Sequence, residues 1–115
     1  MRTITTEMLN WLILFSEQID NQMPVHQGLV FLAVADAGDK GIDMNDIGAL
    51  VGLSTSAVSR NVAALGEWHR MQKPGLGLVF TETDLRDRRR KSVHLTPKGR
   101  RAITALSSSY KDGNS

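Results

Sequence analysis

Cysteine is absent from the 115-residue chain. Its absence excludes disulfide bonds, cysteine-based metal sites and redox sensing by a thiol. Long apolar segments are missing as well, because runs such as Trp11–Phe15 fall far below the roughly 20 residues that a membrane-spanning helix needs. No signal-peptide pattern opens the sequence either, and we therefore expect a cytoplasmic protein with no membrane partner.

Catalytic and metal-binding constellations are also missing from the sequence. Histidine occurs at three scattered positions without the spacing of a metal site: His26, His69 and His94. The consecutive serines 107–109 have no histidine or acid placed by the sequence to activate a nucleophile. We therefore predict no metal, no other cofactor and no enzymatic activity.

The formal net charge of +2 conceals an uneven distribution of charge. Residues 1–59 carry two basic and seven acidic side chains, whereas residues 60–115 carry twelve basic and five acidic ones. The second part should attract a polyanion, and nucleic acid is a candidate partner. Charge alone leaves a second interpretation equally open, in which the basic side chains form a solvated face without a partner.

Residues 1–22 are predicted to form an N-terminal helix with apolar side chains on two sides. One side carries a long stripe: Ile4, Met8, Trp11, Leu12, Phe15 and Ile19. Leu9 and Ile13 form a second stripe. Because one small domain rarely buries both sides of a helix, the pattern suggests contact with a second subunit. The alternative is a helix enclosed by its own fold.

Residues 24–96 are predicted to begin with three further helices. The first starts at Pro24, ends near Gly38 and has an expected buried stripe: Val25, Leu29, Leu32 and Ala33. Asp43 and Ser54 are suited to cap the next two helices, and Gly52 permits the sharp turn between them. Two helices joined by a short glycine turn form a helix-turn-helix.

Two β-prone segments, Leu78–Glu82 and Ser92–Thr96, flank a charged tip and predict an antiparallel hairpin. A last helix is expected over 97–110 and should fray among the serines 107–109. The expected fold class is mainly α with a small β-hairpin (α+β). It is a winged helix-turn-helix in a single domain over 1–115.

The predicted helix after Ser54 has an unusual outer side. Three short side chains and one long cation occupy it: Ser56, Ser59, Arg60 and Ala63. Short side chains let a helix sink into the major groove of DNA, and an arginine there reaches guanine or phosphate. At the N-terminus, Ser54, Thr55 and Ser56 suit phosphate oxygens. Taken alone, these hydroxyls are better explained by capping, but the preceding helix and turn favour DNA contact.

The tip of the predicted hairpin is densely charged. Five cations occupy six positions: Arg86, Arg88, Arg89, Arg90 and Lys91. Such charges repel one another unless a polyanion or nearby acids compensate them. Arginine suits a narrow minor groove because its guanidinium is flat and weakly hydrated. Asp84 and Asp87 are expected to brace this wing by holding neighbouring guanidinium groups in place.

Three motifs together resemble the MarR family of transcriptional regulators. The wing motif D-x-R-D-x-R occupies 84–89, the L-T-P-K-G start of the next helix occupies 95–99, and 53–60 resembles the recognition helix of the family. The resemblance covers residues 25–106, and the chain resembles a short variant. It implies a homodimeric repressor or activator, with a repressor expected here, that binds near-palindromic double-stranded DNA.

The same resemblance implies roles for individual residues. The recognition helix reads the major groove, Arg86 enters the minor groove, and three residues brace the wing: Asp84, Asp87 and Arg89. If a dimer forms, its expected interface is Ile4, Met8, Leu9, Trp11, Leu12, Phe15, Ile103, Leu106 and Tyr110. Such regulators often bind a small-molecule effector, but no residue cluster in this sequence assigns one.

The segment Glu67–Pro74 is longer than the usual link between recognition helix and wing in the family. We expect it to alter the spacing of half-sites or to recruit a partner. It supports an alternative function, in which the winged helix binds another DNA-binding protein or RNA polymerase instead of DNA.

Overall fold

The computed structural model describes residues 4–20, 22–66, 75–87 and 89–113, without the side chains of Ile4 and of residues 109–113. His69, Arg88 and the segment 67–74 therefore lie outside the described residues. The chain forms two compact units, one of Met1–Met23 with Arg101–Ser115 and the other of Pro24–Arg100.

The first unit contains α1 (Ile4–Gln18) and most of α5 (Pro97–Gly113). Leu106 of α5 is buried, with 2% of its surface exposed. The expectation that this helix frays among the serines 107–109 is wrong, because α5 continues to Gly113. Serine is a poorer helix former than alanine but does not break a helix, and no proline or glycine intervenes.

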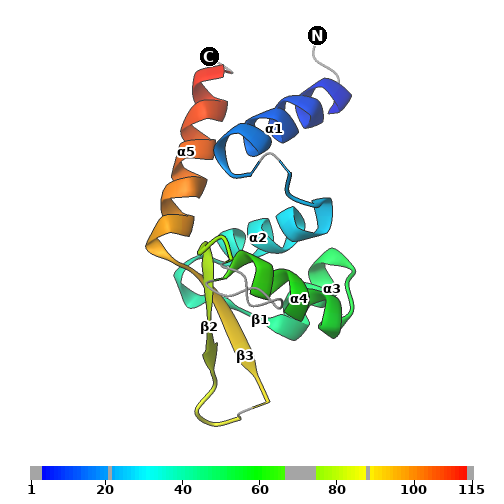
Figure 1. Ribbon diagram of the computed structural model, residues 1–115, viewed down its shortest axis with the longest axis vertical. Helices are drawn as coiled ribbons and strands as arrows, with labels where there is room; N and C mark the ends of the chain where they lie inside the picture. The colour runs from blue at the N-terminus through cyan, green and yellow to red at the C-terminus, as the bar shows by residue number, and fades with distance from the viewer. Residues whose placement is uncertain (1–3, 21, 67–74, 88, 114–115) are drawn as a thin grey trace. The chain divides into compact units, whose positions relative to one another are not determined.

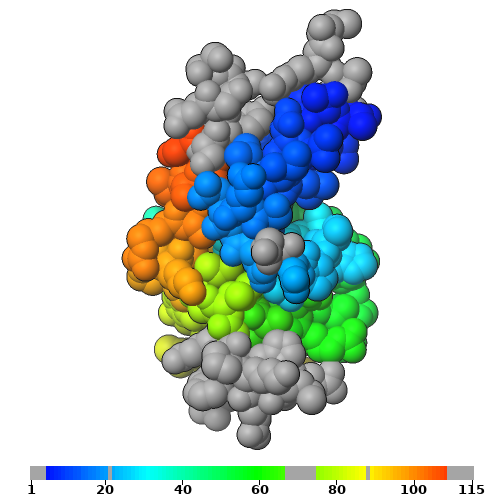
Figure 2. Space-filling model, turned by 45° about the horizontal axis from the view of Figure 1, so that its top comes forward, coloured from blue at the N-terminus to red at the C-terminus, as the bar shows by residue number. Residues whose placement is uncertain are grey.

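The second unit packs three helices beside a small sheet (Figure 1). The helices are α2 (Val25–Ala37), α3 (Met44–Val51) and α4 (Thr55–Leu65), with a short 3-10 turn at Gly38–Lys40. In Figure 2 the cyan surface of α2 borders the green surface of α3 and α4. The strands are β1 (Ile42–Asp43), β2 (Val79–Thr83) and β3 (Lys91–Leu95), antiparallel in the order β1-β3-β2.

These elements confirm the expected winged helix-turn-helix fold. The wing is the hairpin of β2 and β3, which extends away from the three helices in Figure 1. Strand β1 was not predicted, because two residues are too few to show the alternation that identifies a strand.

The core of the second unit is apolar and continuous across its helices and sheet. Its fully or nearly fully buried members are Val30, Phe31, Val34, Ile47, Val58, Val62, Leu65, Leu78, Val79 and Val93. The buried stripe predicted for α2 is largely wrong, since Val25, Leu29 and Leu32 are 72%, 39% and 41% exposed. Helix α2 is apolar on several sides, and spacing alone does not decide which stripe faces the core.

The caps of the helix-turn-helix are formed as predicted. The Asp43 side chain accepts a hydrogen bond from the backbone N–H of Asn45 at 2.8 Å, and Ser54 Oγ accepts one from Ala57 N–H at 3.2 Å. Between the helices Gly52 adopts the left-handed conformation, with φ 77° and ψ 34°. The two bonds fix where α3 and α4 begin, and the left-handed Gly52 marks where α3 ends.

The start of α5 is tied to the strand that leads into the wing. Thr96 Oγ1 donates to the carbonyl of Gly77 at 2.6 Å and accepts from Gly99 N–H at 3.0 Å, so Thr96 caps the helix. Lys98 Nζ donates to the carbonyl of Leu76 at 2.8 Å. The L-T-P-K-G motif therefore holds the first turn of α5 against the segment that precedes β2.

Replacement of Ser54 by alanine tests the cap of α4. The substitution removes the acceptor for Ala57 N–H, and we expect the free energy of unfolding to fall by about 1 kcal/mol in urea denaturation. Ser59→Ala, at an exposed position inside the same helix, is the control and should change it by less than about 0.5 kcal/mol. Equal losses in the two variants would show that the cap contributes nothing.

Candidate nucleic-acid interface

Helix α4 presents opposite properties on its two sides. Val58, Val62 and Leu65 are buried in the core. The other side opens on a shallow surface hollow of about 470 Å³ lined by Ser56, Ser59, Arg60 and Ala63. These four residues are the ones that sequence reasoning assigned to the major groove, and the structure brings them together on one surface.

The three hydroxyls at the N-terminus of α4 all have polar neighbours within the protein. Ser54 Oγ holds Ala57 N–H and lies 3.3 Å from Ser56 Oγ, so its hydroxyl is already engaged in capping. Thr55 Oγ1 lies 3.5 Å from Asn45 Oδ1 at the start of α3. Asn45 is an exposed polar neighbour that sequence reasoning missed, because only the fold brings the two helix starts together.

Two aspartates order the tip of the wing. Asp84 Oδ1 accepts a hydrogen bond from the backbone N–H of Arg86 at 2.8 Å. Asp87 Oδ1 accepts from Arg89 twice, from its backbone N–H at 3.1 Å and from Nε at 3.3 Å. The sequence led us to expect both acids to hold guanidinium groups, but among the described residues the partner of Asp84 is the backbone N–H of Arg86. Both acids thus stabilise tight local turns.

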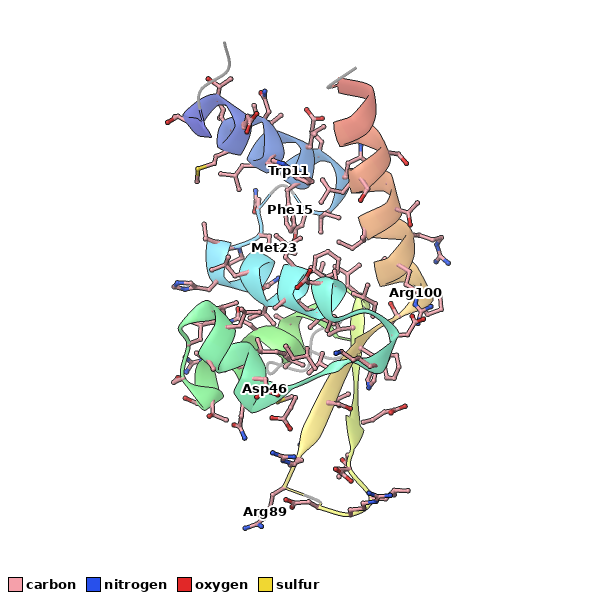
Figure 3. All side chains as sticks on the ribbon, turned by 180° about the vertical axis from the view of Figure 1, so that it is seen from behind. Trp11, Phe15, Met23, Asp46, Arg89 and Arg100 are labelled. Carbon is pink, nitrogen blue, oxygen red and sulfur yellow. The ribbon has the colours of Figure 1, made fainter. Side chains whose placement is uncertain are left out.

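The cations of the tip extend into solvent. The side chain of Arg89 is 92% exposed and lies at the end of the hairpin in Figure 3. Arg86, Arg90 and Lys91 are exposed as well, and within the described part of the chain none of the three forms an ion pair. Their charges are therefore available to an external anion.

One face of the wing joins it to the turn before β1. His94 of β3 stacks on Phe80 of β2 with ring centroids 5.1 Å apart, and its Nε2 lies 2.9 Å from Ser92 Oγ and 3.6 Å from Glu82 Oε2. The ring also lies directly over Gly41, where any β-carbon would overlap it. This contact fixes the base of the hairpin against the end of α2.

The opposite face of the wing turns toward α4. A hollow of about 410 Å³ separates them, with Ser59 and Ala63 of α4 on one side and Thr81 and Lys91 of the wing on the other. The serine-bearing side of α4 and the base of the basic wing therefore open on the same space. Thr81 was missed by sequence reasoning, although the alternation of Val79, Thr81 and Thr83 was a usable signal.

No family model matches the sequence, and no curated protein matches it. Solved structures match over most of the chain. A MepR–DNA complex from S. aureus is 24% identical with a TM-score of 0.71, over 96% of this chain and 82% of that one. PcaV from Streptomyces coelicolor, in complex with its natural ligand, is 24% identical with a TM-score of 0.63, over 96% and 70%.

A probable transcriptional regulator from Pseudomonas aeruginosa is 21% identical with a TM-score of 0.61, over 94% of this chain and 74% of that one. The chain has the MarR-type winged helix-turn-helix fold. The family resemblance carried by the wing and recognition-helix motifs is thereby confirmed at the level of the fold. Within the described residues, no helix is long and apolar enough to cross a bilayer.

Alanine at Gly41 tests the contact that fixes the wing. Gly38 and Gly41 share nearly the same φ, 73° and 74°, but a β-carbon at Gly38 would meet nothing within 4 Å. Both Gly38→Ala and Gly41→Ala should lose about 1–3 kcal/mol of unfolding free energy from backbone strain. Gly41→Ala should lose more, because the His94 ring must also move.

Thermal and urea denaturation of both variants measure this difference. In a His94→Ala background, where the overlapping ring is gone, Gly41→Ala should cost no more than Gly38→Ala does in the same background. Equal losses for the two glycine variants would contradict the contact.

Proposed function

We propose that this protein is a double-stranded DNA-binding transcriptional regulator, acting as a repressor by occupying its operator. Helix α4 lies in the major groove, and the wing places Arg86 in the adjacent minor groove. One observation carries the proposal: Ser59 of α4 and Lys91 of the wing line the same hollow. A single duplex can therefore meet both surfaces at once.

The distribution of charge supports the same partner. Arg60, Arg86, Arg90 and Lys91 are exposed, and the acids nearest the tip are engaged with the wing itself. Basic groups without internal partners gain most from a phosphate backbone, because binding releases the counterions of DNA. The MepR structure that shares this fold was solved with DNA, which favours the proposal further.

We further propose that the regulator binds as a homodimer through α1. Four apolar side chains of α1 are 44–61% exposed: Met8, Leu9, Leu12 and Ile13. A contiguous exposed apolar face of this kind marks an interaction surface. Trp11, Phe15 and Ile103 extend the predicted interface, whereas Leu106 is already buried within the chain. The side chains of Ile4 and Tyr110 lie outside the described residues.

Substitution of Arg86 tests the wing in gel-shift titrations across salt concentrations. We expect Arg86→Ala to weaken binding to operator and to random duplex by similar factors, about tenfold, because the guanidinium contributes charge rather than base readout. The slope of log K against log salt should become shallower by about 0.9.

Two substitutions on α4 provide the contrast. Ser59→Ala and Arg60→Ala should mainly change which sequences are preferred. Lys40→Ala, which removes an exposed lysine outside both surfaces, should change neither property. The wing assignment is wrong if Arg86→Ala leaves the affinity and the salt slope unaltered.

Sedimentation of the intact chain at micromolar concentration tests the dimer. Leu12→Glu should convert dimer into monomer, because it places a charge in the apolar face of α1. Leu50→Glu is a matched control, since Leu50 of α3 is 63% exposed and Leu12 is 61% exposed. A monomeric wild type, or equal dissociation in both variants, would refute the proposed interface.

A further inference from the structure

The hollow between α4 and the wing has a polar rim and an apolar floor. Among the described residues, three polar side chains line it from three elements: Ser59 of α4, Thr81 of β2 and Lys91 at the start of β3. Val62 and Val79 also line it and are only 4% and 2% exposed. The cavity therefore offers hydroxyls and an ammonium above an apolar base.

Adjacent grooves of a duplex are separated by one sugar–phosphate strand. A protein that places a helix in the major groove and a wing in the next minor groove must straddle that strand. Resting on the proposed function, we infer that this hollow holds the intervening backbone, with Thr81 and Lys91 as ligands of one phosphate.

The pairing of β2 with β3 places Glu82 on the face of the wing opposite this site. Thr83 pairs with Lys91 and Thr81 pairs with Val93, which is fully buried, so these side chains occupy the face toward α4. Glu82 pairs with Ser92 on the other face, where its carboxylate approaches His94. Among the described residues that line the hollow, Lys91 therefore carries the charge and none is a carboxylate.

The rim groups also fit a phosphate chemically. The Lys91 ammonium is a mobile point charge with three donors, and the hydroxyl of Thr81 adds a directional donor. No pocket for a base edge is required, so this contact fixes the register of the protein on DNA rather than the sequence that it reads.

The test uses the full chain and duplex DNA selected from a random pool by the wild-type protein. A series of duplexes carries one neutral methylphosphonate at each successive backbone position. Wild type should lose about tenfold in affinity at one position per half-site, between the contacts of α4 and those of the wing. Lys91→Gln should lose about tenfold on the unmodified duplex, and the modification at that position should then cost no more than the roughly fivefold that the Thr81 hydroxyl contributes.

The hydroxyl is tested with a matched pair of variants. Thr81→Val should lower affinity about fivefold without changing the salt slope, whereas Thr83→Val, two residues along the same face but outside this hollow, should leave affinity unchanged. Lys40→Gln controls for the loss of one positive charge.

The outcomes separate the two proposals. Wild type that selects no sequence and binds no duplex overturns the proposed function and this site with it. Wild type that binds specifically, while Lys91→Gln keeps its full sensitivity to every methylphosphonate, overturns the site alone. Equal effects of Thr81→Val and Thr83→Val overturn the role of Thr81.

Discussion

Burial of one side of α4 is the interaction on which the rest of the second unit depends. Val58, Val62 and Leu65 pack into a core shared with α2 and the sheet, and they form one apolar stripe along α4. Once the valine and leucine side is fixed inward, Ser56, Ser59 and Arg60 must face outward. The orientation of the proposed DNA-reading surface thus follows from apolar packing on the opposite side of the helix.

Local chemistry could be predicted from the sequence more reliably than packing. The caps at Asp43, Ser54 and Thr96 depend on side chains that bond to backbone a few residues away, so their positions show in the sequence itself. The buried side of α2 could not be predicted in this way, because several sides of the helix are apolar. Only contact with α3 and α4 determines which side is buried. The same holds for β1, whose two residues become a strand only by pairing with β3.

The candidate site shows the same division. The hydroxyls of α4 and the cations of the wing were identified from short motifs, since residue type and spacing carry that information. Asn45 and Thr81 were not identified, because each becomes part of the site only when distant segments meet. Asn45 lies beside Thr55, and Thr81 lies across a hollow from Ser59. Alternate residues of a strand lie on the same face, so the apolar Val79 would have placed Thr81 on the correct face of β2. It would not have given the distance of Thr81 from α4.

The two aspartates of the wing have a consequence for the energetics of recognition. By bonding to the backbone of Arg86 and Arg89, they hold the loop in one shape before any partner arrives. A loop that is already ordered loses little conformational freedom on association, so more of its interaction energy appears as affinity. The same carboxylates also moderate the attraction of the tip for any polyanion. For the proposed DNA-binding function, this means weaker binding to non-specific sequences and a faster search for the operator along a chromosome.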